Sequence, residues 1–177
     1  MARTVAIVLR GAPGAGKSPV TDALQERYSL SKSSRVSLDT FWGTGQKRFA
    51  GYCRYWDLRD QPDVLIIELG YGEPAGQSFA GATKNPREWV SILENDGREI
   101  FFFLLHVSQS EGNQRKIAKG EKPYPSEVYN RFKPGGVCSS PVFSALLGNG
   151  HSEDPIDTET TNVARMVDRI VTKVGSV

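Results

Sequence analysis

The chain has 177 residues, of which 38% are hydrophobic and 24% charged, a composition typical of an ordinary globular protein. Its formal net charge of +2 does not by itself indicate a nucleic-acid or membrane-surface partner. The apolar run Thr4–Leu9 is too short for a signal peptide or a membrane span, and no other stretch reaches membrane length. Cys53 and Cys138 lack metal-site spacing and are predicted to be free thiols. We therefore expect one cytoplasmic domain over residues 1–177 without a membrane segment.

Strands and helices are predicted to alternate along the chain. Thr4–Leu9 is apolar on both faces, as in a buried parallel strand, and Pro19–Tyr28 has the composition of a helix whose first turn tolerates proline. The remaining elements are predicted from apolar periodicity and from glycine and proline breaks. They are a strand at Arg35–Leu38, a strand at Asp63–Gly70, a helix at Asn85–Asp96, a strand at Glu99–Val107, helices at Ser110–Lys119 and Ser126–Lys133, a loop at Gly135–Gly150, a short strand within "DPIDTE" and a helix at Val163–Val174. This alternation predicts a parallel α/β sheet covered by helices on both faces.

The segment "GAPGAGKS", Gly11–Ser18, matches the motif G-x-x-x-x-G-K-[ST] between a predicted strand and a predicted helix. Glycines let the backbone curl so that its N–H groups point at phosphate oxygens, and the helix that follows presents its positive end to the same anion. Lys17 can reach the β- and γ-phosphates, and Ser18 can offer its hydroxyl to Mg²⁺. The segment therefore predicts a bound nucleoside triphosphate with Mg²⁺, with contacts from Gly11, Pro13, Gly14, Ala15, Gly16, Lys17, Ser18 and Pro19.

Three fates are open to a triphosphate held in this way: transfer to a second substrate, hydrolysis coupled to motion, or a GTP switch. A GTPase usually carries the base-reading pattern N-K-x-D, which "TKNP" at Thr83–Pro86 matches only in part. The short chain and a basic segment over 111–125 favour a kinase that uses ATP.

Two carboxylates are predicted at the carboxyl ends of neighbouring strands, where α/β sheets bind their ligands. Asp39 in "VSLDTF" can accept the proton of an acceptor hydroxyl, or it can simply cap a helix. Glu68 in "VLIIELG" can orient Mg²⁺ through water or bind the acceptor, or it can make a structural contact with the phosphate loop.

Basic residues in two segments extend the candidate site. In "NQRKIAKGEKPYP" the cations are Arg115, Lys116, Lys119 and Lys122, which predict a lid over the phosphates or, alternatively, a solvated helix end. Arg115 is the preferred lid residue because a guanidinium can bridge phosphates. The aromatic and basic run Phe41–Arg59 can bind an acceptor through Arg48 and Arg54, or it can pack its aromatic rings into the core.

Together these segments resemble small P-loop kinases of the polynucleotide kinase and zeta toxin-like group. The resemblance is carried by "GAPGAGKS", "VSLDTF", "VLIIELGYG", "NPREWVSILENDG", "EIFFFLLHV" and "QRKIAKGEKPYPSEVYNRF". It implies a three-layer fold with a five-stranded parallel sheet in the order 2-3-1-4-5, ATP and Mg²⁺ as cofactors, Asp39 as the base and Arg115 as a lid residue.

The sequence departs from that group at three places. Pro19 stands where the group usually has a hydroxyl residue, the lid is rich in lysine, and the connection from Asp39 to Val64 is short. These departures leave the acceptor open among a small metabolite, a nucleotide sugar or antibiotic, which we favour, and the 5′-hydroxyl of a nucleic acid. A regulator or NTPase without an acceptor is the alternative of a different class.

Overall fold

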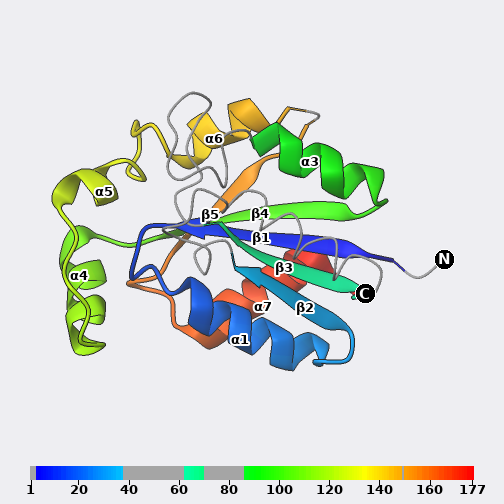
Figure 1. Cartoon of the computed structure of the whole chain (residues 1–177), viewed down its shortest axis with the longest axis horizontal. Helices are drawn as coiled ribbons and strands as arrows, with labels where there is room; N and C mark the ends of the chain where they lie inside the picture. The colour runs from blue at the N-terminus through cyan, green and yellow to red at the C-terminus, as the bar shows by residue number, and fades with distance from the viewer. Residues whose placement is uncertain (1–2, 38–61, 70–85, 149) are drawn as a thin grey trace.

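A computed structural model describes residues 3–37, 62–69, 86–148 and 150–177 of the chain. In these residues five strands alternate with helices, as the sequence predicts (Figure 1). The elements are β1 Val5–Gly11, α1 Lys17–Tyr28, β2 Ser33–Ser37, β3 Val64–Leu69, α3 Pro86–Asn95, β4 Glu99–His106, α4 Gln109–Ala118, α5 Ser126–Asn130, α6 Ser140–Leu147, β5 Glu153–Asp157 and α7 Val163–Val174. No helix in the described ranges is long and apolar enough to cross a membrane.

The five strands form one parallel sheet in the order β2-β3-β1-β4-β5, which confirms the predicted strand order. β1 lies at the centre, with Leu9 beside Glu68 of β3 on one side and Phe103 of β4 on the other. Every residue of β1 and β3 is buried, as the continuous apolar runs require. Because the strands are parallel, their carboxyl ends meet at one edge, where the phosphate loop follows β1.

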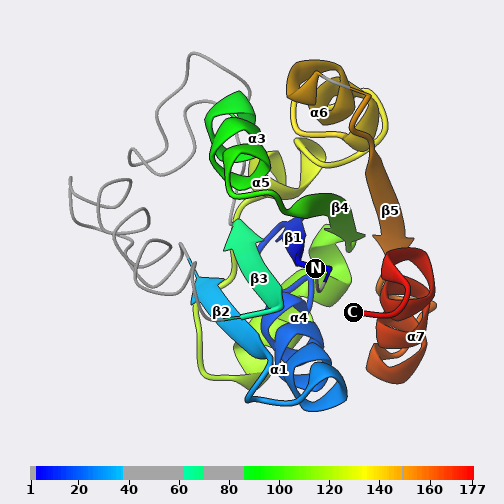
Figure 2. The same cartoon turned by 90° about the vertical axis from the view of Figure 1, so that its right-hand side faces the viewer.

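Helices cover both faces of the sheet and so make three layers. α3 and α6 lie on one face, and α1 and α7 lie on the other (Figures 1 and 2). Alternate residues of β1 supply the two cores: Ile7 packs in the cluster that includes α1 and α7, whereas Val8 packs in the cluster that includes α3 and α6. α4 and α5 stand beyond the carboxyl ends of the strands (Figure 1).

Two predicted elements differ from the structure. Residues 135–150 were expected to form a loop, but α6 occupies Ser140–Leu147 and buries Phe143 and Leu147 against the sheet. The glycines before α6 and its Pro141 suggested a loop, although proline in a first helical turn is well tolerated. The helix predicted at Ser126–Lys133 ends earlier, at Asn130.

A buried ion pair joins the end of β1 to β5. The Arg10 Nε donates to Glu153 Oε1 at 2.7 Å and the Arg10 Nη2 donates to Oε2 at 2.6 Å, and both side chains have no exposed surface. The Ser140 hydroxyl donates to the same carboxylate at 2.8 Å, and the Arg10 guanidinium lies 3.8 Å from the centre of the Phe143 ring. This cluster fixes the start of α6 to the strand that leads into the phosphate loop.

Candidate nucleotide site

The phosphate loop, Gly11–Ser18, turns directly from β1 into α1. Gly16, the residue before α1, has a φ of 87°, a conformation that glycine adopts without the steric cost of a side chain. Gly14 has a φ of 77°, and a Cβ built there would lie 2.4 Å from the carbonyl oxygen of Gly112 in α4. The two glycines therefore permit the turn and a close approach to α4. Pro19 lies in the first turn of α1, as predicted.

Lys17 folds back over its own loop. Its side-chain ammonium donates to the carbonyl oxygens of Gly11 at 2.9 Å and Ala12 at 3.3 Å, and the residue is 8% exposed. The charge is thus held against the backbone at the start of the loop.

Ser18 is the first member of a chain of polar contacts that runs into the sheet. Its hydroxyl donates to Glu68 Oε2 at 3.3 Å, and Glu68 is 2% exposed at the end of β3. The other oxygen, Glu68 Oε1, lies 2.6 Å from Arg35 Nη2 of β2. Arg35 also donates through Nη1 to Asp22 Oδ1 of α1 at 2.8 Å. The contact between Glu68 and the phosphate loop, the alternative given for this residue, is therefore present.

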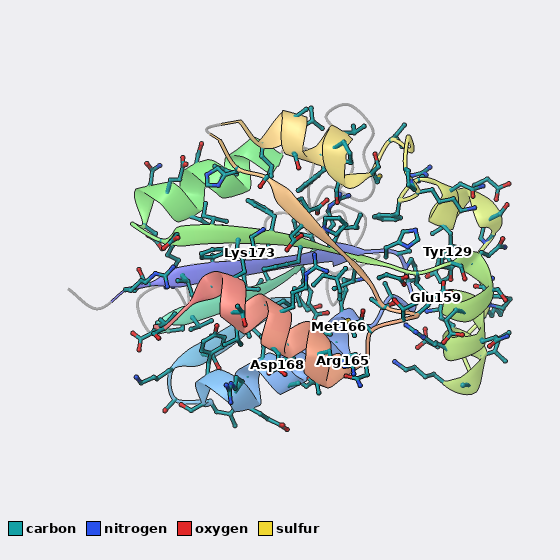
Figure 3. All side chains as sticks on the ribbon, turned by 180° about the vertical axis from the view of Figure 1, so that it is seen from behind. Tyr129, Glu159, Arg165, Met166, Asp168 and Lys173 are labelled. Carbon is teal, nitrogen blue, oxygen red and sulfur yellow. The ribbon has the colours of Figure 1, made fainter. Side chains whose placement is uncertain are left out.

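A pocket of about 830 Å³ opens over the phosphate loop, which is within the usual range of small-molecule sites. The phosphate loop, α4 with the segment after it, and the start of α7 form its walls. The lining residues are Pro13, Gly14, Gly16, Lys17, Ser18, Pro19, Arg115, Lys116, Ala118, Lys119, Glu121, Tyr124, Thr158, Thr161, Asn162, Val163 and Met166. Figure 3 shows Met166 on α7 and Glu159 at the turn before it, beside α4.

Arg115 holds α4 to the loops on either side of the pocket. Its Nε pairs with Glu111 Oε1 at 2.8 Å, one helical turn earlier. Its Nη1 donates to the Gly14 carbonyl at 3.4 Å and to Thr158 Oγ1 at 3.0 Å, and its Nη2 donates to the Thr158 carbonyl at 2.8 Å. In this arrangement the guanidinium bonds to protein oxygens at the rim of the phosphate loop.

The helix α4 itself packs tightly between the phosphate loop and α5. A Cβ on Gly112 would lie 2.5 Å from Tyr129 Cε1, so only glycine fits between Gly14 and Tyr129. The Tyr129 hydroxyl donates to Asn113 Oδ1 at 2.9 Å, and Asn113 Nδ2 donates to the Tyr124 carbonyl at 2.9 Å. Burial raises the pKa of the Tyr129 phenol above its ordinary value.

The other predicted lid cations differ in their placement. Lys119 lines the pocket, whereas Lys122 is not among the lining residues. Lys116 also lines it, pairs with Glu121 and lies 4.9 Å from the centre of the Tyr124 ring. Three predicted residues, Asp39, Arg48 and Arg54, lie outside the described residues, as does Cys53. Cys138 is buried and forms no disulfide within the described residues.

Sequence reasoning missed several residues of the site. Thr158, Thr161 and Asn162 line the pocket because β5 ends beside β4 and brings the turn before α7 to the phosphate loop. Arg35 was assigned only to a strand, because its partners are 13 and 33 positions away in the sequence. Thr158, Thr161 and Asn162 could have been found from the sequence. They lie in "IDTETTN", which follows the last predicted strand, and parallel strands end at the ligand edge of the sheet.

The residues present fit a triphosphate with Mg²⁺. The loop offers backbone N–H groups, a buried ammonium and the positive end of a 12-residue helix, all features that bind anions. Mg²⁺ takes oxygen ligands and keeps several waters, so the Ser18 hydroxyl with the Glu68 carboxylate beside it is a suitable protein contribution.

No family model matches the chain, and no curated protein matches it. Solved structures do match it over nearly its whole length. A shikimate kinase from Acinetobacter baumannii in complex with shikimate has a TM-score of 0.56 at 15% identity, covering 98% of this chain and 94% of that one. A shikimate kinase from Bacteroides thetaiotaomicron has a TM-score of 0.56 at 16% identity, covering 96% and 98%. A gluconokinase from Sinorhizobium meliloti 1021 has a TM-score of 0.51 at 14% identity, covering 98% and 97%.

The likeness establishes the fold as the one found in P-loop kinases, with the predicted sheet order. The narrower resemblance to polynucleotide kinases and zeta toxin-like kinases stays a prediction.

Proposed function

We propose that this chain is a kinase that transfers the γ-phosphate of ATP to a hydroxyl group of a small molecule. The observation that carries the proposal is the position of Lys17 and Ser18 at one pocket, with the Glu68 carboxylate in contact with Ser18. This is the set of groups that phosphoryl transfer requires for positioning phosphates and Mg²⁺.

Each residue has a stated task in the proposed reaction. Lys17 and the loop N–H groups bind the β- and γ-phosphates, and Ser18 ligates Mg²⁺, which neutralises phosphate charge when bound. Asp39 accepts the proton of the acceptor hydroxyl, whose oxygen forms a bond to the γ-phosphorus while the bond to the bridging oxygen of ADP breaks. Arg115, Lys119 and Lys122 form the lid that excludes water and balances the developing charge, and in this arrangement Arg115 bonds to Gly14 and Thr158. Arg48 and Arg54 contact the acceptor, and Glu68, beside the Ser18 hydroxyl, supports Mg²⁺.

A small acceptor is favoured over a nucleic acid by two observations. The structural neighbours named above are two shikimate kinases and a gluconokinase, which are named for small-molecule substrates. The net charge of +2 is also low for a chain that binds a polyanion. A polynucleotide 5′-hydroxyl is the second candidate acceptor, because the segment "QRKIAKGEKPYPSEVYNRF" resembles the lid of kinases that act on such ends.

The test is a comparison of Asp39→Asn with the native chain and with Asp168→Asn, a substitution on α7. A panel of small hydroxyl acceptors and 5′-hydroxyl oligonucleotides is incubated with γ-labelled ATP and Mg²⁺. Asp39→Asn is expected to lower transfer roughly 10²–10⁴-fold, the range of general-base catalysis, and to keep ATP binding. Asp168→Asn is expected to behave as native. Intact transfer by Asp39→Asn would show that the base is assigned wrongly, and label found only as free phosphate would favour an NTPase or regulator.

A further inference from the structure

Arg35 of β2 pairs with two carboxylates, Glu68 of β3 and Asp22 of α1. Its Nη2 lies 2.6 Å from Glu68 Oε1, and its Nη1 lies 2.8 Å from Asp22 Oδ1. The Arg35 side chain is 30% exposed and the Glu68 side chain 2%, so the guanidinium reaches from the surface to a buried carboxylate. No role for Arg35 follows from the phosphate-loop motif.

Glu68 needs such a partner because of where it lies. It is the one charged residue of the otherwise apolar strand β3, all of whose residues are buried. A buried carboxylate without compensating contacts is costly, and a planar guanidinium is the side chain best suited to pair with it. Arg35 thus supplies the charge that lets a carboxylate lie at this position.

The contact also fixes which oxygen of Glu68 faces the phosphate loop. Oε1 forms the ion pair with Arg35, and the other oxygen, Oε2, lies 3.3 Å from the Ser18 hydroxyl. Ser18 and Asp22 are four residues apart on α1, so they lie on the same side of the helix one turn apart. Arg35 therefore ties the first turns of α1 and the end of β3 into one unit.

We propose that Arg35 is a positioning residue for the magnesium site. By holding Oε1, it keeps Oε2 of Glu68 beside the Ser18 hydroxyl, where the carboxylate supports Mg²⁺ bound through that hydroxyl. This inference rests on the proposed function, since it assumes that Ser18 ligates Mg²⁺ in the complex with ATP. It assigns to Arg35 an effect on metal affinity rather than on contact with the nucleotide.

The test separates metal binding from nucleotide binding. Binding of ATP is measured by calorimetry in EDTA and then as a function of Mg²⁺ concentration, for the native chain, Arg35→Met, Arg35→Lys and Arg169→Met. Loss of a residue that orients a metal ligand typically costs 10–100-fold in metal affinity, so Arg35→Met is expected to raise the half-saturating Mg²⁺ concentration roughly 10–100-fold. ATP affinity in EDTA is expected to stay at the native value. Arg35→Lys keeps the positive charge but lacks the two guanidinium nitrogens that reach Glu68 and Asp22. Its half-saturating Mg²⁺ concentration is expected to lie between those of the native chain and Arg35→Met.

Arg169→Met is the matched control, since Arg169 pairs with Asp154 at 2.8 Å on the β5 and α7 side of the sheet. It is expected to leave both measurements unchanged. If Arg35→Met does not fold, Asp22→Asn is measured in its place. Asp22 is 63% exposed and pairs with Nη1, the guanidinium nitrogen of Arg35 that does not face Glu68. A smaller rise in the Mg²⁺ requirement is expected there.

Unchanged or tighter Mg²⁺ binding in Arg35→Met would overturn the inference, and so would an equal loss of ATP binding in EDTA and in Mg²⁺. If Arg35→Met does not fold, unchanged Mg²⁺ binding in Asp22→Asn would overturn it. The proposed function fails in a different way, namely if the native chain binds no ATP with or without Mg²⁺, and the inference would fall with it.

Discussion

The ammonium of Lys17 has two oxygen partners in the phosphate loop, the carbonyls of Gly11 and Ala12. Phosphate oxygens would add charged partners to it, and hydrogen bonds to charged groups contribute about 1.5–3 kcal/mol. Lys17→Met keeps the length of the chain and removes the charge, so we expect the Kd for Mg²⁺-ATP to rise roughly 10–100-fold in calorimetry. Lys173→Met removes a lysine of α7 that pairs with Asp154 of β5, and it serves as the control. Equal affinity of Lys17→Met and the native chain for Mg²⁺-ATP would contradict the role of Lys17 in binding the phosphates.

The buried ion pair between Arg10 and Glu153 is expected to contribute strongly to the stability of the fold. Removing one partner of a buried ion pair leaves the other charge unpaired, which typically costs about 3–5 kcal/mol. Glu153→Gln is therefore expected to lower the free energy of unfolding by about that amount in urea titrations. Glu99→Gln, which removes the exposed partner of Arg3, is the control and is expected to cost less than about 1 kcal/mol. Similar losses in the two variants would show that the burial of Glu153 is unimportant.

A place at the pocket can be predicted for residues that belong to one continuous motif. Lys17 and Ser18 were predicted because strand, loop and helix follow one another along the chain. The partners of Arg10 and Arg35 could not be predicted in this way. Arg10 and Glu153 are separated by 143 positions, and their pairing depends on the register of β1, β4 and β5.

At the scale of elements, the packing of α4 depends on Gly112. An exposed helical glycine replaced by alanine gains helix stability of about 1 kcal/mol, whereas overpacking costs about 1–3 kcal/mol. Because a Cβ on Gly112 would lie 2.5 Å from Tyr129 Cε1, we expect Gly112→Ala to lower the unfolding free energy and weaken ATP binding. Ser110→Ala, at an exposed position of α4, is the control and is expected to do neither. A gain in stability in Gly112→Ala would contradict the tight packing of α4.

The turn between β5 and α7 predicts an acid-sensitive contribution to stability. The Glu159 N–H donates to Asp157 Oδ1 at 2.9 Å and is the largest influence lowering the pKa of the Asp157 carboxyl, with a further hydrogen bond from Thr160. A carboxyl whose folded pKa is lowered stabilises the fold above its unfolded pKa, near 3.8, and this contribution is lost as the pH falls through the folded value. Asp157→Asn should therefore melt below native at pH 6, with a difference that narrows toward pH 2.5. Thr160→Val, which keeps the carboxylate, should show a smaller difference of the same sign.

A difference in melting temperature between Asp157→Asn and native that stays constant or widens with acid would contradict this account of the turn.

The elements themselves were predicted best where apolar periodicity is long. Residues 163–174 form α7 as predicted, with Met166, Val167, Ile170 and Val174 buried. α6 was missed because it has only eight residues, carries Pro141 in its first turn and follows two glycines, so local signals resemble a loop. Its formation depends on tertiary contacts of Phe143 and Leu147 with the sheet.

For the whole molecule, the alternation of strands and helices predicts a covered parallel sheet, and the family resemblance supplies its order. That order places β1 between β3 and β4 and so puts the phosphate loop at the centre of the ligand edge. The acceptor could not be predicted, because the predicted acceptor contacts at Asp39, Arg48 and Arg54 come from a segment without a motif of known ligand geometry. The same residues lie outside those that the structure describes.

The most direct test of the account follows γ-labelled phosphate from ATP in the presence of Mg²⁺ and a panel of hydroxyl acceptors, with the native chain and Lys17→Met in parallel. We predict that the native chain places label on one class of small hydroxyl acceptor and that Lys17→Met places little or none. Label that remains in ATP, or that appears only as free phosphate with every acceptor, would contradict the assignment of this chain as a kinase.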